Sequence, residues 1–507
     1  RTQAKAFEMG VKTPTVKREG FRIRKDWFIE KNEGRPDEHY NTSKKLGQGT
    51  FGVVHLVVDK RNSKQRVMKT INKDKAQMPP EMLEAEIQIL KRVDHPHIIK
   101  VFDYYDDERN VYIVMEQAAG GELLGVINKN MALDPPQLPS EKWVAQVLEQ
   151  CLGAIAYCHS RRLIHKDIKA ENIMLLSNDF ANPHAVIIDL GLAEMFKTRD
   201  QKTDLACGTP MTMAPEVWSA AQGTGATFGS KVDIWSFGCV MFQLITGQIP
   251  FYAPSCEPDD WLKVIRKGPR WEWFAGLPDA ESLCRRMLTL SPDQRPSAQD
   301  CLKHKWFSLA SDTQGSIDPS RLRALAEYAD KNALQKAVYL QIASQMDAQD
   351  LKNINDVFKQ ADVDRDGFLK PEELVDALKR MGMSEREAAK AASAMDLSGA
   401  GMIQYTEFVA ACISKYDSRL EDHLFHAFQL FAKGAGGDGQ HITREALVAM
   451  LSRGEASGLG WAPSQLEISQ IVDELDVSRE GLIDFQEFRR YFVSHASIRP
   501  DFKAAKQ

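Results

Sequence analysis

The sequence of 507 residues has no long apolar run, few cysteines and no excess of basic side chains. A membrane-spanning helix needs about 20 consecutive apolar residues, and the longest apolar runs here are interrupted by charges such as Asp189. The 65 Lys and Arg residues face 70 Asp and Glu residues, and a net charge of −5 argues against a dedicated nucleic-acid-binding protein. We therefore expect a soluble protein with no transmembrane segment and no nucleic-acid partner.

Eight cysteines are scattered along the chain without a CxxC pair or a Cys/His cluster. This density is too low for a disulfide scaffold and indicates a reducing, cytoplasmic compartment. The contents of 43% hydrophobic and 27% charged residues exclude a disordered chain, a collagen and a coiled-coil rod. The first residue is Arg1, which indicates a fragment or a processed form and leaves membrane attachment open.

Composition and periodicity divide the chain into successive zones. The first zone is polar, with a short ordered piece expected around Phe28, and the next begins with strand-like segments and one helical stretch. A long helical zone follows, then a polar linker that becomes an amphipathic helix. Beyond it a helix–acidic loop–helix unit recurs, which is an internal repeat. The expected units are 1–39 (an N-terminal extension), 40–307, 308–350, 351–414, 415–494 and 495–507 (a C-terminal tail).

Four motifs supply glycines, cations, carboxylates and an amide in a fixed order. The glycine-rich segment 47–53 runs into a strand, which disfavours a dinucleotide site and leaves phosphate binding or a plain hairpin turn. Lys69 lies in an apolar strand, where a buried ammonium needs an anion such as Glu86. Residues 165–172 and 189–191 then contribute Asp, Lys and Asn side chains. Transfer of a γ-phosphoryl group needs such a base, such cations and such oxygen ligands for magnesium.

In this order the motifs resemble those of eukaryotic-type serine/threonine protein kinases over residues 40–307. The resemblance implies that Asp167 is the catalytic base, that Lys169 contacts the transferred phosphate, and that Lys69 paired with Glu86 holds the α- and β-phosphates of ATP. The implied Mg²⁺ ligands are Asn172 and Asp189. The implied nucleotide-binding residues are Gly47, Gln48, Gly49, Thr50, Phe51, Gly52, Val53, Lys69, Met115, Glu116, Gln117, Glu122, Asn172 and Asp189.

Two residues depart from the kinase pattern. Lys166 replaces an arginine that binds a phosphorylated activation segment, and lysine is only a point charge, which weakens the expectation of phosphate-dependent activation. Leu190 replaces a phenylalanine, and because both are apolar we expect little effect. Glu122 and Glu171 stand where similar kinases bind a substrate arginine, which favours substrates with basic residues near the target Ser or Thr. Alternatively, Glu122 contacts the ribose and Glu171 is structural.

Three acidic loops predict calcium sites. Residues 362–373 fit the EF-hand loop at every ligand position. In 396–407 Ala400 stands where a ligand side chain belongs, so this loop is either weaker or empty. Residues 476–487 fit better, whereas 431–447 keeps the helical rhythm without acidic ligands and is expected to bind no calcium. The expected ligands, by side chain or by carbonyl, are Asp362, Asp364, Asp366, Phe368, Glu373, Asp396, Ser398, Met402, Glu407, Asp476, Ser478, Glu480, Leu482 and Glu487.

A kinase followed by four EF-hand-like units resembles the calcium-dependent protein kinases of plants and alveolate protists. The implied fold is an α+β bilobal kinase domain, an autoinhibitory junction helix over 308–350, and an all-α domain of two EF-hand pairs. The implied function is a calcium-activated serine/threonine kinase in an intramolecular switch: the junction inhibits by occlusion or by distortion, and the calcium-loaded EF-hands bind it instead. The basic residues of the junction form either a pseudosubstrate or a solvated face: Arg321, Arg323, Lys331 and Lys336.

Two rival hypotheses stay open at this point. The first is a calcium-responsive scaffold with negligible phosphoryl transfer. The second is a kinase whose EF-hands are purely structural, so that activity does not depend on calcium. The intact catalytic motifs argue against the first, and the complete ligand set of the loop at 362–373 argues against the second.

Overall fold

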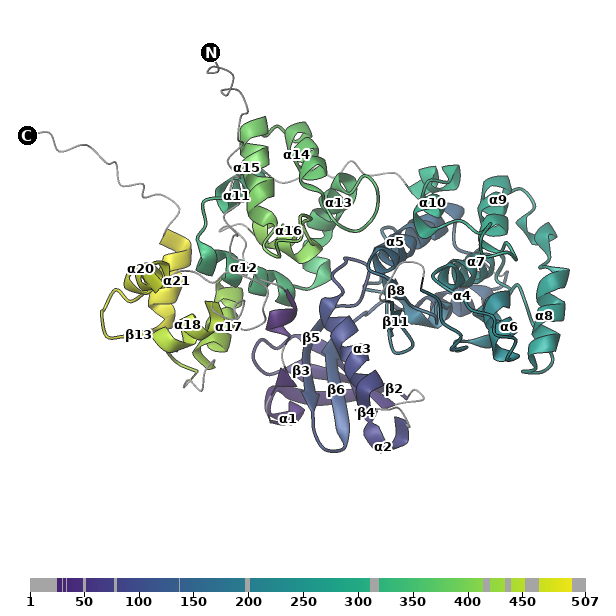
Figure 1. Cartoon of the computed structure of the whole chain (residues 1–507), viewed down its shortest axis with the longest axis horizontal. Helices are drawn as coiled ribbons and strands as arrows, with labels where there is room; N and C mark the ends of the chain where they lie inside the picture. Colours follow the sequence, from purple (N-terminus) through teal and green to yellow (C-terminus); the bar gives the residue numbers. More distant parts are fainter. Residues whose placement is uncertain are drawn as a thin grey trace, which may run out of the picture.

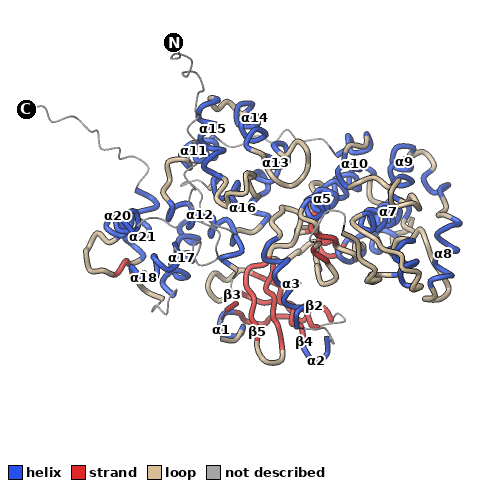
Figure 2. Tube along the Cα trace, in the orientation of Figure 1, coloured by secondary structure: helices blue, strands red, loops and turns tan. Residues whose placement is uncertain are grey.

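The computed structural model shows one small lobe rich in strands and two large helical regions (Figure 2). No helix among the described residues is both long and apolar enough to cross a membrane. The structure describes residues 25–29, 31–32, 34–48, 52–76, 80–135, 137–196, 201–310, 319–413, 420–433, 439–451 and 465–494.

The small lobe is a six-stranded sheet with a long helix, α3, against it (Figure 1). The strand order is β1-β5-β6-β4-β3-β2, and only the β1–β5 pair is parallel. Valines favour the extended backbone of β3, and Ile87 and Leu90 of α3 are buried toward the sheet. The elements are β1 (Lys31–Asn32), α1 (Pro36–His39), β2 (Tyr40–Gln48), β3 (Gly52–Asp59), β4 (Gln65–Asn72), α2 (Lys73–Ala76), α3 (Pro80–Arg92), β5 (Val101–Asp106) and β6 (Asn110–Met115), preceded by the 3-10 helix η1 (Lys25–Phe28).

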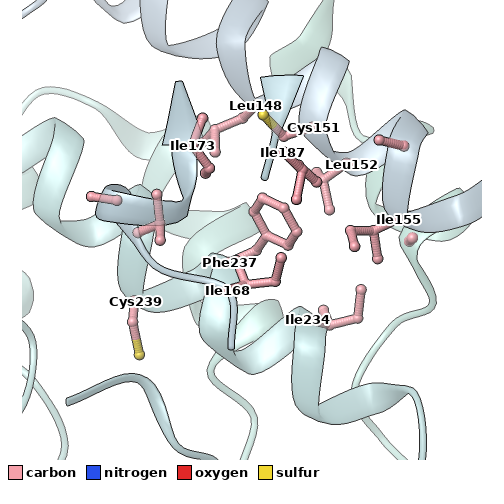
Figure 3. Packing of buried hydrophobic residues seen from close by; sticks show 14 of the residues in the cluster. Leu148, Cys151, Leu152, Ile155, Ile168, Ile173, Ile187, Ile234, Phe237 and Cys239 are labelled. Carbon is pink, nitrogen blue, oxygen red and sulfur yellow. The ribbon is translucent and has the colours of Figure 1, made fainter. Parts of the chain in front are cut away.

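The large lobe is built around two buried helices, α5 (Glu141–Ser160) and α7 (Lys231–Thr246). The Ser140 side chain caps α5 by accepting the Trp143 N–H, and Gly247 ends α7 in the left-handed region at φ 70°. Their apolar side chains meet around Phe237 (Figure 3). The other elements are β7 (Gly121–Glu122), α4 (Leu123–Met131), β8 (Leu163–Ile164), η2 (Ala170–Asn172), β9 (Ile173–Leu175), β10 (Ala185–Ile187), β11 (Glu194–Met195), η3 (Pro210–Thr212), α6 (Pro215–Ala221), α8 (Pro258–Lys267), η4 (Trp271–Phe274), α9 (Pro278–Met287), α10 (Ala298–Leu302) and η5 (Lys305–Ala310).

The junction consists of two helices, α11 (Pro319–Tyr328) and α12 (Ala333–Gln345), so the expectation of a single helix over this segment was wrong. The break has a local cause, because the Asn332 side chain accepts the Gln335 N–H and starts a new helix. The apolar residues of both helices are buried in the same core as the EF-hand helices. They include Leu325, Tyr328, Leu334, Val338 and Ile342.

The EF-hand region forms two pairs of units, each joined by a short backbone pairing between its loops. In the first pair Leu369 and Ile403 exchange N–H···O bonds of 3.0 and 2.8 Å. In the second pair Ile442 lies opposite Ile483 in an antiparallel ladder. The elements are η6 (Ala348–Leu351), α13 (Lys352–Ala361), α14 (Pro371–Arg380), α15 (Glu385–Met395), α16 (Tyr405–Cys412), α17 (Leu420–Lys433), β12 (Ile442–Thr443), α18 (Arg444–Leu451), α20 (Gln465–Leu475), β13 (Leu482–Ile483) and α21 (Phe485–Ser494).

Candidate functional site

The cleft between the lobes brings together three of the predicted kinase residues. Lys69 lies on β4, and its Nζ is 3.0 Å from Asp189 Oδ1 and 3.7 Å from Glu86 Oε1. Burial opposes the charge of this ammonium, but Asp189 and Glu86 together raise the pKa of Lys69. The Lys69 side chain is therefore charged, and it lies between Glu86 of α3 and Asp189.

The loop that carries Asp167, which we call the catalytic loop, is held in place by one buried carboxylate. Asp233 of α7 is fully buried, and its two oxygens accept the backbone N–H groups of His165 and Lys166 at 3.0 and 2.9 Å. Lys166 has a positive φ of 67°, a strained conformation for a residue with a side chain, and these bonds help to hold it. The anchor fixes the backbone immediately before Asp167.

Asp167 is held by three side chains. Its Oδ1 accepts the Thr209 hydroxyl at 2.7 Å, and its Oδ2 lies 2.7 Å from Lys169 Nζ and 3.0 Å from Asn172 Nδ2. Lys169 also donates to the Thr209 hydroxyl at 2.9 Å. The arrangement presents an oriented carboxylate beside a cation, as a base for a hydroxyl proton requires.

Lys166, which departs from the kinase pattern, has an acidic partner in the segment between Asp189 and Glu216, the activation segment. Lys166 Nζ is 2.8 Å from Glu194 Oε2, and its side chain is 3% exposed. β11, which carries Glu194, pairs with β8 beside the catalytic loop. At the far end of the segment Arg295 binds both oxygens of Glu216 at 2.7 and 3.1 Å. The charge of Lys166 is thus satisfied without a phosphate group.

The structure describes most of the expected nucleotide-binding residues, which lie on or next to β2, β3, β6 and β7 and around Asn172 and Asp189. Gly52 starts β3, and a Cβ there would lie 1.9 Å from the Thr70 carbonyl oxygen, so only glycine fits. Met115 ends β6, and Glu116 and Gln117 follow it. The buried Glu116 side chain accepts the Ala348 N–H at 2.6 Å, so it is turned toward the junction. The remaining predicted residues Gly47, Gln48, Val53 and Glu122 lie on β2, β3 and β7, whereas Gly49, Thr50 and Phe51 lie outside the described residues.

Asn172 and Asp189 offer oxygens suited to magnesium. The amide nitrogen of Asn172 donates to Asp167, which leaves its carbonyl oxygen as the atom that can face a metal. Lys69 lowers the pKa of Asp189 although burial opposes this effect, so the carboxylate is ionised. Leu190 beside it is buried in the core, as an apolar residue at this position should be.

The loop at 362–373 has the geometry of a calcium site. Asp362 accepts the N–H groups of Asp366 and Gly367 at 3.1 and 2.9 Å. Oxygens of Asp362, Asp364 and Glu373 lie within 4.8 Å of one another. Burial and the neighbouring carboxylates raise the pKa of Asp362 to about 7. Lys370 pairs with Asp364 and lies 3.7 Å from Asp366, so one ammonium offsets part of this negative charge. Acidic oxygens gathered in this way are the ligands that a hard divalent cation prefers.

Loops 396–407 and 476–487 repeat the same backbone pattern. The first Asp of each accepts two N–H groups at 2.8 to 3.1 Å, from Ala400 and Gly401 or from Glu480 and Gly481. The closing carboxylates, Glu407 and Glu487, accept the N–H groups of Ser398 and Ser478 at 2.7 and 2.9 Å. Met402 and Leu482 hold the expected carbonyl positions. The centre of the third loop, 434–438, lies outside the described residues.

The first EF-hand pair is docked on the kinase domain, which the sequence did not predict. Thr406 donates its hydroxyl and its N–H to the buried Asp94 at 2.6 and 2.9 Å. Glu149 on α5 pairs with Lys359 at 2.5 Å and with Arg365 at 3.4 Å. Glu149 is buried, but the side chains of Lys359 and Arg365 are 47% and 40% exposed, so solvent screens part of this attraction. The one signal in the sequence for this contact is a single charged residue within a largely apolar segment, such as Glu149.

Calcium-loop residues themselves take part in this contact. The Phe368 ring lies 5.1 Å from the Tyr157 ring, and the Arg161 guanidinium lies over Phe368 at 4.9 Å. Phe368 is an expected carbonyl ligand, and Arg365 lies between two expected carboxylate ligands. The shape of this loop and its fit to α5 therefore depend on each other.

The end of the junction is fixed to the small lobe. Lys100 is buried and donates to the carbonyl oxygens of Ala343 and Met346 at 3.2 and 2.7 Å, which satisfies the C-terminal end of α12. Asp347 pairs with Arg66 at 2.5 Å and with Lys64 at 2.6 Å. The junction is thus bound to both the EF-hand core and the kinase (Figure 1).

Comparison with known proteins agrees with both halves of this structure. Residues 40–307 match the protein kinase domain, and residues 351–413 match the EF-hand domain pair. Calcium-dependent protein kinase 3 of Plasmodium berghei (strain Anka) is 30% identical over 480 residues, covering 93% of this chain and 83% of that protein. Calcium-dependent protein kinase 21 of Arabidopsis thaliana is 29% identical over 466 residues, covering 90% and 83%. Calcium-dependent protein kinase 11 of Oryza sativa subsp. japonica is 31% identical over 468 residues, covering 90% and 77%. The chain belongs to the calcium-dependent protein kinases, which are serine/threonine kinases regulated through EF-hands.

Proposed function

We propose that Asp167 accepts the proton of a substrate Ser or Thr hydroxyl while the γ-phosphoryl group of ATP is transferred to that oxygen. Lys169 neutralises the phosphoryl oxygens, and Lys69 holds the α- and β-phosphates at the point where Glu86 and Asp189 converge on it. Magnesium held by Asn172 and Asp189 would supply further positive charge to the phosphates. The convergence of Lys69, Glu86 and Asp189, with an oriented Asp167 nearby, is the observation that supports this assignment.

The switch proposed for this chain is a competition for the apolar face of the junction. Loops 362–373 and 476–487 bind calcium, loop 396–407 binds it more weakly, and the third loop binds none. In the calcium-loaded state the EF-hand core buries this face, as in the arrangement described above. Without calcium the grooves close, and the released face packs on the kinase domain and inhibits it.

The contacts of the basic junction residues help to decide whether these residues act as a pseudosubstrate. Arg321 donates to the Cys412 carbonyl oxygen at 3.3 Å, and Lys331 and Lys336 lie over the rings of Tyr339 and Tyr328 at 4.7 and 5.5 Å. These contacts favour a structural role for Arg321, Lys331 and Lys336 in the calcium-loaded state.

Peptide phosphorylation by the full chain in calcium and in chelator tests the proposed switch. With magnesium-ATP and an arginine-containing serine peptide, we expect activity in calcium and little in chelator. Equal activity in both conditions would refute calcium control but leave the kinase assignment. ATP binding without transfer to any peptide would favour the scaffold hypothesis.

Substrates with basic residues are proposed from two carboxylates at one side of the cleft. Glu122 precedes α4 and Glu171 lies in η2, and these two elements are in contact. Because Glu122 is exposed and Glu171 is partly exposed, their attraction for an arginine is screened by solvent and remains moderate.

Replacing Glu122 and Glu171 together by glutamine is expected to raise KM for an arginine-containing peptide by roughly tenfold, because two charge-assisted hydrogen bonds are lost. A peptide with alanine in place of arginine should show no such change. Glu108→Gln, at an exposed site on the β5–β6 hairpin, is the matched control. A rise in KM for ATP instead of peptide would indicate that Glu122 contacts the ribose.

A further inference from the structure

Residues 25–29 and 31–32 precede the part of the chain that matches the kinase domain, yet they pack on the small lobe. β1 extends the sheet by pairing with β5, with Lys31 opposite Tyr104 and Asn32 opposite Tyr105. Asn32 Nδ2 also donates to Asp103 Oδ1 at 3.1 Å. The segment therefore forms one edge of the sheet, beside β5.

Ile29 is 1% exposed and belongs to the same buried cluster as Ile87 and Leu90 of α3. It lines a small groove between α3 and the sheet together with these two residues, Lys91 of α3, Val101 and Tyr104 of β5, and Ile113 of β6. Because Ile87 directly follows Glu86, the side chain of Ile29 supports the helix one residue away from the partner of Lys69.

Lys25 fixes the other end of the segment. Its Nζ donates to the Val93 carbonyl oxygen at 2.9 Å and lies 3.3 Å from Asp94 Oδ1, just beyond the end of α3. Asp94 is the residue that also receives Thr406 from the first EF-hand pair. η1 lies against both α3 and the junction helix α12. The segment thus contacts α3, β5 and α12, and it shares Asp94 with the first EF-hand pair.

We propose that residues 25–29 and 31–32 position α3 for catalysis, with Ile29 as the positioning residue that keeps Glu86 on Lys69. Ile29 acts through Glu86 and does not contact substrate. If the groove is emptied, α3 gains a second arrangement in which the Lys69–Glu86 pair is broken. The fraction of molecules competent for transfer then falls, while substrate binding by the large lobe is unaffected.

Ile29→Ala in the full chain, assayed at saturating calcium, tests this proposal. We expect kcat to fall roughly tenfold because an emptied groove lets α3 move, with KM for peptide unchanged. Ile29→Val should restore most of the activity, since it keeps the branched shape. Lys31→Ala, which removes a half-exposed side chain of the same segment, is the matched control and should behave like the wild type.

Hydrogen exchange distinguishes a loss of α3 positioning from a general destabilisation of the kinase domain. Ile29→Ala should speed exchange in α3 and leave α7 protected. Unchanged kcat and α3 exchange would overturn the proposal, as would equal loss of protection in both helices. If Ile29→Ala does not fold, Lys25→Met tests the same segment through its ion pair, and wild-type kcat and α3 exchange in that variant would also overturn it. Failure of calcium control would show separately, as equal wild-type activity in calcium and in chelator.

Discussion

Replacing Asp167 by asparagine is expected to lower kcat by about 10³-fold, because asparagine keeps the shape but cannot accept the hydroxyl proton. The side-chain amide can still form hydrogen bonds with Thr209, Lys169 and Asn172, which bind the carboxylate in the wild type. ATP affinity should therefore change little. Single-turnover phosphorylation at saturating calcium measures the rate of the chemical step, and an equilibrium binding experiment measures the affinity for ATP.

The control for this substitution is Asp37→Asn, at an exposed carboxylate on α1. It should leave both quantities unchanged. A loss in Asp167→Asn smaller than tenfold would mean that another group accepts the proton. A loss of ATP binding in the same variant would mean that the substitution disturbs the cleft as a whole, so the two measurements together distinguish a base from a structural residue.

The fold class could be predicted from the sequence, and candidate residues for the two chemistries could be named, because each depends on short segments. Glycines before a strand and the spacing of acidic residues around Gly367 specify local backbone geometry, and local geometry can be inferred from neighbours. The α+β kinase domain followed by an all-α EF-hand domain was confirmed in this way. The break in the junction was missed because the apolar stripe continues through it, although Asn332 is a recognisable cap.

The docking contacts could not be predicted because they join residues far apart in the sequence. Thr406 and Asp94 are separated by 312 residues, and neither lies in a motif. Lys100, just before β5, and Glu149, within α5, are buried charges, and such charges need partners since an unpaired buried charge is costly. Their identities depend on how the EF-hand region is placed, which no local pattern specifies. Ile29 is similar, because a single isoleucine in a polar segment carries no periodic signal.

Glu373→Gln is expected to weaken calcium binding to the first loop by roughly 100-fold, because the closing carboxylate supplies both ligand oxygens and charge. Glu373 also accepts the N–H groups of Val363, Asp364 and Lys370 at 3.2, 3.3 and 3.0 Å, so it orders the loop around the site. Calorimetric calcium titration of the full chain should show one strong site lost. The calcium concentration for half-maximal kinase activity should rise accordingly.

Glu372→Gln is the matched control, because this neighbouring glutamate is exposed and is not one of the expected ligands. Glu487→Gln gives a second comparison in the last loop. The first loop contacts the kinase through Phe368 and Arg365, which lie against Tyr157 and Glu149. Losing its calcium should therefore impair activation more than losing calcium from the last loop. An unchanged activation curve in Glu373→Gln, despite the lost site, would show that docking on α5 does not depend on calcium in this loop.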